Sequence, residues 1–169
     1  MLNDVLTIWS TIAPILKLAG VLREPVLNAG DDNSLLKRLT VLSEEYDLKF
    51  IILHGSYATG KEHKDSDVDV AVICEQELKF DRYLSLSGKM QDALALPPEV
   101  DLDFKTLNKV DPLFRYEVTR NGKLLYGNAE DYKKYKAFSL YAYRDTRPLF
   151  NLERKLVRKF QNHLNKLYD

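Results

Sequence analysis

The chain has 169 residues, of which 45% are hydrophobic and 30% are charged. This length suits one domain, or one domain with an accessory helical arm, and folding then buries roughly 70% of the unfolded surface. The composition excludes an intrinsically disordered chain. The single cysteine, Cys74, excludes a disulfide framework and a cysteine-rich zinc site. Because the formal net charge is zero, general binding to duplex nucleic acid is not expected.

The N-terminal segment does not read as a membrane anchor. No apolar run reaches the ~20 residues of a membrane span, because Asp4, Lys17 and Arg23 interrupt it. The chain also begins without the basic residues that open a secretory signal. We therefore expect a cytoplasmic protein that makes no membrane contact.

The charges are unevenly distributed along the chain. Residues 1–128 carry 15 basic and 20 acidic side chains, whereas residues 129–169 carry 10 basic and 5 acidic ones. Two interpretations of the basic tail stay open, namely a solvated helix face and a docking surface for an anionic partner.

Hydrophobic periodicity divides the chain into three parts. Helices are expected over 2–27 and from 33 or 34 to 46, and the tail from 130 is expected to be helical with an interruption at Arg147-Pro148. The middle alternates strands and helices, with expected bounds of 50–54 (strand), 68–73 (strand), 80–94 (helix), 100–104 (strand), 112–120 (helix) and 123–126 (strand). This alternation predicts an α+β (α/β) fold with a small mixed sheet. The expected parts are an N-terminal helical extension (1–46), a core (47–128) and a C-terminal helical segment packed on it (129–169).

A candidate phosphate-binding loop follows the first strand of the middle part. Gly55 and Ser56 open a helical turn, where free backbone N–H groups and the helix dipole favour an anion. Lys61 and Lys64 are candidates to neutralise a triphosphate, and Ser66 is a further candidate ligand of the nucleotide.

Two aspartates at i and i+2 give the strongest chemical signal. Asp67 and Asp69 leave the same face of a strand, with their Cα atoms ~6.5–7 Å apart. Like charges so placed require a counter-ion, and a hard cation such as Mg²⁺ takes carboxylates together with substrate phosphates. Asp101 and Asp103 show the same alternation on another strand, and either can complete a carboxylate triad. Such a triad suits two-metal phosphoryl or nucleotidyl transfer. An exposed acidic strand face is the alternative.

The order of these features resembles a known signature. Gly55-Ser56, ten further residues and Asp67-x-Asp69 are similar to the G-S-x10-D-x-D motif of the DNA polymerase β-type nucleotidyltransferase superfamily. More narrowly, the chain resembles the minimal nucleotidyltransferases, the antitoxins of HEPN/minimal-nucleotidyltransferase toxin–antitoxin pairs. The similarity extends over about residues 49–147. It includes the segments 100–102, 113–118, 120–126 and 143–148.

The resemblance implies a nucleotidyltransferase core and transfer of AMP from ATP to a tyrosine hydroxyl of a cognate HEPN ribonuclease toxin, which silences the toxin. It implies that Gly55 and Ser56 hold the triphosphate and that Asp67 and Asp69 bind two Mg²⁺ ions. Asp101 would be the third carboxylate and the base, although Asp103 leaves that choice open. The chain departs from the family at Thr59, where an arginine is frequent.

Two other functions remain as alternatives. A non-catalytic antitoxin would keep the fold and block the toxin by binding alone. A small-molecule nucleotidyltransferase, for example one acting on aminoglycosides, is less favoured because no large acceptor domain follows residue 129. Among the histidines, His54 is expected to pack beside the phosphate loop.

Overall fold

The structure is a computed structural model that describes residues 32–63, 66–96 and 99–168. The helix expected over 2–27 lies outside this part of the chain. The elements alternate between helices and strands. Their bounds are α2 (Asp32–Tyr46), β1 (Leu48–His54), α3 (Gly55–Thr59), β2 (Val68–Cys74), α4 (Phe80–Leu94), β3 (Leu102–Thr106), α5 (Pro112–Asn121), β4 (Lys123–Tyr126) and α6 (Ala129–Tyr168).

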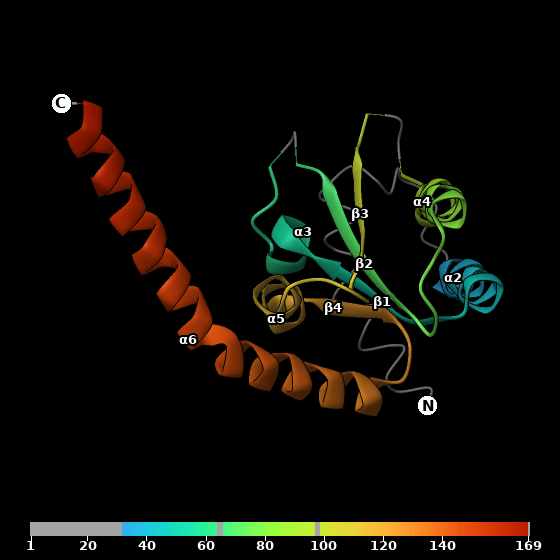
Figure 1. The fold of residues 1–169 in the computed structure, drawn as a ribbon. Coiled ribbons are helices and arrows are strands. Elements are labelled where there is room, and N and C mark those ends of the chain that lie inside the picture. Colours follow the sequence, from blue (N-terminus) through green and yellow to red (C-terminus); the bar gives the residue numbers. More distant parts are fainter. Residues whose placement is uncertain (1–31, 64–65, 97–98, 169) are drawn as a thin grey trace.

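Four strands form one mixed sheet in the order β3-β2-β1-β4. Strand β1 runs antiparallel to β2 and to β4, whereas β2 and β3 are parallel. Helices α2 and α4 cover one face, and α5 with the first part of α6 lies against the other (Figure 1). This architecture confirms the expected α+β class with a small mixed sheet.

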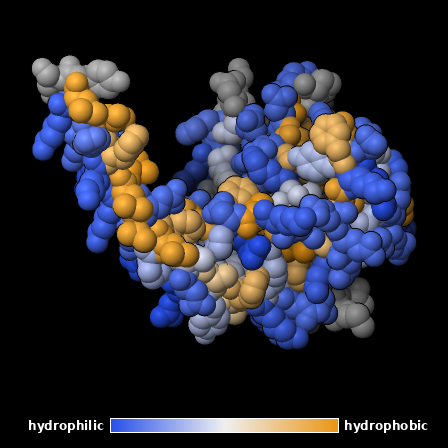
Figure 2. Space-filling view, viewed as in Figure 1, coloured by the Kyte–Doolittle hydropathy of each residue, from blue (hydrophilic) through white to orange (hydrophobic). Residues whose placement is uncertain are grey.

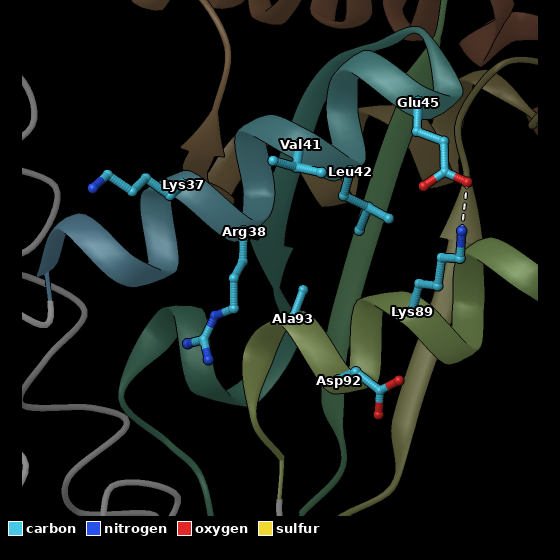
Figure 3. A pocket seen from close by; sticks show the side chains of 8 residues that line it. All are labelled: Lys37, Arg38, Val41, Leu42, Glu45, Lys89, Asp92 and Ala93. Carbon is cyan, nitrogen blue, oxygen red and sulfur yellow. Dashed lines mark hydrogen bonds and ion pairs between the residues drawn. The ribbon is translucent and has the colours of Figure 1, made fainter.

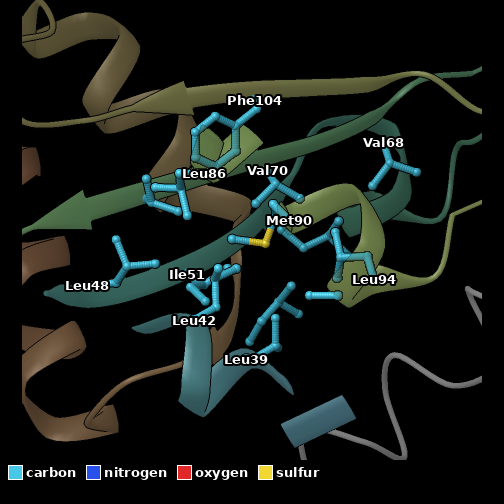
Figure 4. Close-up of a cluster of buried hydrophobic side chains, with 14 of the residues drawn as sticks. Leu39, Leu42, Leu48, Ile51, Val68, Val70, Leu86, Met90, Leu94 and Phe104 are labelled. Atoms are coloured by element: carbon cyan, nitrogen blue, oxygen red, sulfur yellow. The ribbon is translucent and has the colours of Figure 1, made fainter. Parts of the chain in front are cut away.

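The larger core lies between the sheet and the α2/α4 layer (Figure 4). Ile51 and Val70 project from the central strands and are fully buried. Leu39 of α2 and Met90 of α4 pack over them. Because side chains alternate between the faces of a strand, the neighbours of Ile51 and Val70 point to the opposite layer.

The smaller core fills that opposite layer. Phe50 contacts Tyr132 of α6 edge-on, with ring centroids 5.5 Å apart. Ile52 and Val118 complete its centre, which joins β1 to α5. Helix α5 is therefore anchored beside the end of β1, where the predicted phosphate loop begins.

Side-chain caps fix the starts of the two helices on this face. The Asp111 carboxylate accepts a hydrogen bond of 3.0 Å from the Phe114 amide, and Pro112 occupies the first turn of α5. The Asn128 side chain accepts from the amides of Glu130 and Asp131 at 2.9 and 3.0 Å. Both caps satisfy backbone donors that a helix start leaves free.

Most expected elements appear with nearly the expected bounds, but two differ. Strand β3 begins at Leu102 rather than at residue 100, because its first pair with β2 is Val68–Leu102. The interruption expected at Arg147-Pro148 is wrong, since α6 continues through Pro148. A proline removes one helical hydrogen bond and bends a helix without always ending it, and α6 changes direction midway along its length (Figure 1).

The packing expected for the whole segment 129–169 also needs correction. The first part of α6 packs through Tyr132 and Ser139, both buried, but none of residues 149–167 is buried. Figure 1 shows this second part extending away from the body of the protein. Within the described part of the chain, no helix combines the length and apolar character that crossing a bilayer requires.

Candidate functional site

The candidate site begins where β1 ends. Gly55 has a φ of +68°, a left-handed conformation that glycine adopts without strain. A Cβ atom built on Gly55 would lie 1.9 Å from Oδ2 of Asp69. The Asp69 carboxylate therefore lies directly against the backbone of the predicted phosphate loop, and only glycine leaves room for it.

Internal hydrogen bonds shape the loop that follows. The Thr59 hydroxyl and the Lys61 amide both donate to the Ser56 carbonyl, each at 3.1 Å. Tyr57 is buried, and its hydroxyl donates to the Ser66 carbonyl at 3.2 Å. The loop is thus closed on itself and tied to the residue that precedes the two aspartates.

The structure brings some predicted nucleotide ligands together. Gly55 is exposed and Ser56 is half-buried at the start of α3, while Lys61 lies exposed at the rim. Ser66 is half-buried, and its hydroxyl accepts a hydrogen bond of 2.8 Å from the His63 amide. Lys64 lies outside the described residues.

The acidic residues of two parallel strands meet in register. Asp69 of β2 is paired with Asp103 of β3, so both carboxylates leave the sheet on the α5 side, opposite to the larger core. Asp101 is exposed and precedes β3, where its carbonyl accepts a hydrogen bond of 2.9 Å from the Val68 amide. Asp67 is exposed and immediately precedes β2. Of the two candidates for a third carboxylate, Asp103 therefore lies directly beside Asp69. Asp101 lies two residues earlier in the chain, just before the start of β3.

The electrostatics of Asp69 reflect this crowding. Burial raises the pKa of its carboxyl group, and the negative charge of Asp103 raises it further. Asp67 acts in the same direction and Lys105 in the opposite one. A site that raises the pKa of an acid disfavours its anion, so a cation placed here would relieve the repulsion.

Lys105 supplies the positive charge on this face. Its ammonium group forms an ion pair with Asp103 and lies 6.0 Å from the centre of the Phe114 ring. Sequence reasoning did not single out Lys105. The signal for it is positional, because Lys105 continues the alternation of Asp101 and Asp103 along the same strand face.

His54 lies at the end of β1, beside the site. It is only 8% exposed, and its ring packs edge-on against the Phe114 ring, with the ring centroids 6.2 Å apart. Burial lowers the pKa of His54 to about 4, with Asp103 opposing and Lys105 adding to that effect. No described residue provides a hydrogen-bond partner for its Nε2 atom. As expected, His54 packs beside the phosphate loop, as a neutral imidazole near neutral pH.

The donor set fits a metal that is shared with a substrate. Among the described residues, no three histidine, cysteine or acidic side chains gather closely enough to hold an ion by themselves. Mg²⁺, however, commonly takes one or two carboxylates and completes its shell with water and phosphate oxygens. The raised pKa of Asp69 beside Asp103 marks a carboxylate pair that such an ion would suit.

A separate hollow lies on the opposite side of the sheet, between α2 and α4 (Figure 3). It has a volume of about 430 Å³. Val41, Leu42 and Ala93 form its apolar wall, and the ion pair of Lys89 with Glu45 lies at one edge. The sheet separates this hollow from the carboxylates, so it has no part in chemistry at Asp69.

The sequence profile of a known family spans this site. The profile described as "Polymerase beta, Nucleotidyltransferase" matches residues 37–131, from α2 to the first turn of α6. The chain belongs to this nucleotidyltransferase family. The match contains Gly55, Ser56 and the four aspartates described above.

Two curated relatives of this nucleotidyltransferase carry more specific names. This chain is 31% identical over 96 residues to "Protein adenylyltransferase MntA" of Shewanella oneidensis. The aligned residues make up 56% of this chain and 66% of MntA. The chain is 36% identical over 70 residues to "Putative protein adenylyltransferase MJ1379" of Methanocaldococcus jannaschii, or 40% of this chain and 68% of that relative. The matched part is therefore about two thirds of each relative's length.

Solved structures share the fold of this nucleotidyltransferase. A chain from a "toxin-antitoxin with AMP-PNP" superposes with a TM-score of 0.57 and 25% identity, covering 73% of this chain and 95% of the other. A chain from the complex of the tri-AMPylated Shewanella oneidensis HEPN toxin with its MNT antitoxin has a TM-score of 0.53 and 22% identity, covering 74% and 93%. Together with the profile match and the curated relatives, the first of these structures confirms the resemblance to minimal nucleotidyltransferases.

Proposed function

We propose that this protein is an antitoxin that transfers AMP from ATP to a tyrosine hydroxyl of a cognate HEPN toxin in the cytoplasm, and so neutralises it. The observation that carries the proposal is the contact of the Asp69 carboxylate with the Gly55 backbone, with Asp103 in register beside it. This arrangement sets acidic side chains against a loop suited to phosphate. The names of the matched relatives support a protein as the acceptor.

The reaction is a substitution at the α-phosphorus of ATP. The acceptor oxygen forms a bond to this phosphorus, and the bond to the oxygen that bridges the α- and β-phosphates breaks. Pyrophosphate leaves with that electron pair, and the hydroxyl proton passes to a carboxylate of the site. Two bound Mg²⁺ ions would supply charge stabilisation on the phosphates and lower the pKa of the acceptor hydroxyl.

The chain's own residues divide this task. Gly55 and Ser56 are proposed to bind the triphosphate through the backbone of α3. Asp67 and Asp69 are proposed to hold the metals. Asp101 stays a prediction for the third carboxylate and base, and the pairing of Asp103 with Asp69 makes Asp103 its competitor.

The flanking groups support nucleotide binding. Lys61 and Lys64 are proposed to lie beside the outer phosphates, and Ser66 to order the loop that leads into β2. His54 is buried and neutral near pH 7, so we propose that it supports the floor of the site and transfers no proton.

Labelled ATP tests the proposal directly. The protein is incubated with Mg²⁺, ATP labelled at the α-phosphate and the HEPN toxin encoded beside it. We expect label on a toxin tyrosine, identified by mass spectrometry, and none with Asp69→Asn. Comparing Asp101→Asn with Asp103→Asn then identifies the third carboxylate, because only its loss abolishes transfer. A toxin that is neutralised by the wild type but never labelled would contradict the enzymatic proposal.

The binding-only antitoxin stays the alternative prediction, and one variant separates it from the enzymatic proposal. Under this alternative, the Asp67→Asn/Asp69→Asn variant would still rescue the growth of cells that express the toxin. Under the enzymatic proposal, it would not.

A further inference from the structure

The second part of α6 forms an exposed arm that has no part in the candidate site described above. We call residues 149–167 the distal arm. All its side chains are exposed except Phe150 and Leu164, which are partly covered. The arm nevertheless has a fixed base, because Tyr143 of α6 stacks on Tyr116 of α5 with ring centroids 4.8 Å apart.

Apolar side chains form a single stripe along the distal arm. They recur at intervals of three, four and seven residues, which places them on one face of a helix. They are 53% to 64% exposed, and they are Leu149, Leu152, Leu156, Phe160 and Leu167. Figure 2 shows them as a continuous band on the side of the arm that is turned toward the body of the molecule in this view. Contiguous apolar surface of this kind marks an interaction site.

Basic side chains flank this stripe. The arm carries five lysine or arginine residues and one acidic residue, Glu153. Lys155, Lys159 and Lys166 lie along one edge and line a shallow hollow of about 420 Å³ with Asn162. Within the described residues, none of these three lysines forms an ion pair. The hollow thus offers cationic groups without acidic neighbours.

This charge pattern selects among the possible occupants. A second copy would set lysines against lysines, because both arms carry the same basic edge, and like charges across an interface are unfavourable. Nucleic acid would match the lysines and leave the leucine stripe uncovered. A protein helix with apolar residues between acidic ones satisfies both features, as in helix-in-groove recognition.

We propose that the distal arm binds the toxin acceptor through an apolar helical surface edged with aspartate or glutamate. This inference rests on the proposed function for the identity of the acceptor. The stacked Tyr116–Tyr143 pair joins α5 to the segment of α6 that precedes the arm, and α5 carries Phe114 of the site. The arm therefore holds the acceptor at a set position relative to the carboxylates.

A pair of charge-matched variants tests this role. Leu156→Glu/Phe160→Glu places two charges in the stripe, whereas Gln161→Glu/Asn165→Glu places the same charges at exposed positions outside the stripe and away from Lys155. Binding to the purified toxin is measured by titration calorimetry, and the KM and kcat of AMP transfer are measured for each variant. We expect the stripe variant to bind at least about 30-fold more weakly, as the loss of a binding hot spot does. Its KM for toxin should rise with kcat unchanged, and the control should match the wild type.

The lysine edge gives a second test. Lys155→Glu/Lys159→Glu should weaken toxin binding, and the salt dependence of binding should become smaller than in the wild type. Unchanged affinity of both the stripe and the lysine variants for the toxin would overturn the proposal. The proposal would also be overturned if the wild type bound a labelled RNA and only the lysine variant lost that RNA while still binding the toxin.

Two further outcomes identify other occupants of the stripe. A wild-type dimer that the stripe variant converts to monomers would assign the stripe to a second copy. A shift in the fluorescence of Trp9, the one tryptophan, in the stripe variant alone would assign it to the N-terminal segment. Either result overturns the proposal. Toxin that binds through the arm but gains no AMP would instead contradict the proposed function and leave the docking role standing.

Discussion

The carboxylate of Asp69 occupies the space where a side chain on Gly55 would begin, since a Cβ atom there would lie 1.9 Å from Oδ2. Gly55→Ala must therefore displace Asp69 or the loop. A shift of about 1 Å in a reacting group can cost about 100-fold in rate. We expect AMP transfer to fall by that factor or more, measured as label on the toxin.

Gly60 provides a matched control for this substitution. It has the same φ of +68°, but a Cβ atom there would meet nothing within 4 Å. Gly60→Ala should cost about 1–2 kcal/mol of unfolding free energy from the left-handed backbone alone, with transfer retained. Equal effects of the two substitutions on transfer would show that contact with Asp69 is irrelevant.

Removing the charge of Asp69 should stabilise the protein while abolishing its activity. The raised pKa of this carboxyl group means that its anion is disfavoured in the folded state, so stability is lost as the pH rises through that pKa. Asp69→Asn should therefore have a higher Tm than the wild type at pH 7 in metal-free buffer, and the difference should vanish in acid. Transfer should fall by more than about 100-fold, since even residues that only support a metal ligand are worth 10–100-fold.

Asp145→Asn serves as the control for this change, because Asp145 is exposed on α6. Its Tm and its transfer rate should equal those of the wild type. A Tm for Asp69→Asn at or below the wild-type value at pH 7 would contradict the repulsion inferred between Asp69 and Asp103.

His54 should make the folded state sensitive to acid. Its pKa lies at about 4 in the folded protein, below the ordinary 6.5, so the unfolded chain binds a proton that the folded one does not. The neutral His54 ring therefore contributes to the free energy of unfolding above pH 6.5. This contribution, about 3 kcal/mol in total, is lost as the pH falls toward 4. Urea unfolding of wild type and His54→Gln from pH 7 to 4 should show the wild type losing this amount relative to the variant. His63→Gln, at an exposed site, should follow the wild type throughout.

Much of the fold could be predicted because its patterns are local. The helix 80–94 and the strand 123–126 have the expected bounds, since strong periodicity and flanking turn residues define them. The start of β3 could not be predicted, because alternation continues through residues 100–104 and only the pairing of Val68 with Leu102 decides it. At Pro148, the propensity of the long helical flanks outweighs the local effect of proline.

The candidate site was predictable to a similar extent. The motif from Gly55 to Asp69 has a fixed spacing, so the sequence identifies it. The choice between Asp101 and Asp103 depends on strand register, which the sequence does not contain. Lys105 belongs to no motif, and only its place on the sheet face brings it to Asp103.

Lys105 should compete with the metal for the carboxylates. Its ammonium group is paired with Asp103 and lowers the pKa of Asp69, so it already neutralises part of the charge that would attract a cation. Lys105→Met keeps the length of the side chain and removes the charge. We expect this variant to bind Mn²⁺ several-fold more tightly, measured by titration calorimetry without nucleotide. Its Tm in metal-free buffer should be lower, because the repulsion between the carboxylates is less relieved.

Lys109→Met is the control, since Lys109 pairs with Glu77 instead, and its affinity for Mn²⁺ should stay at the wild-type value. Weaker Mn²⁺ binding by Lys105→Met than by Lys109→Met would mean that Lys105 organises the carboxylates for the ion instead of competing with it.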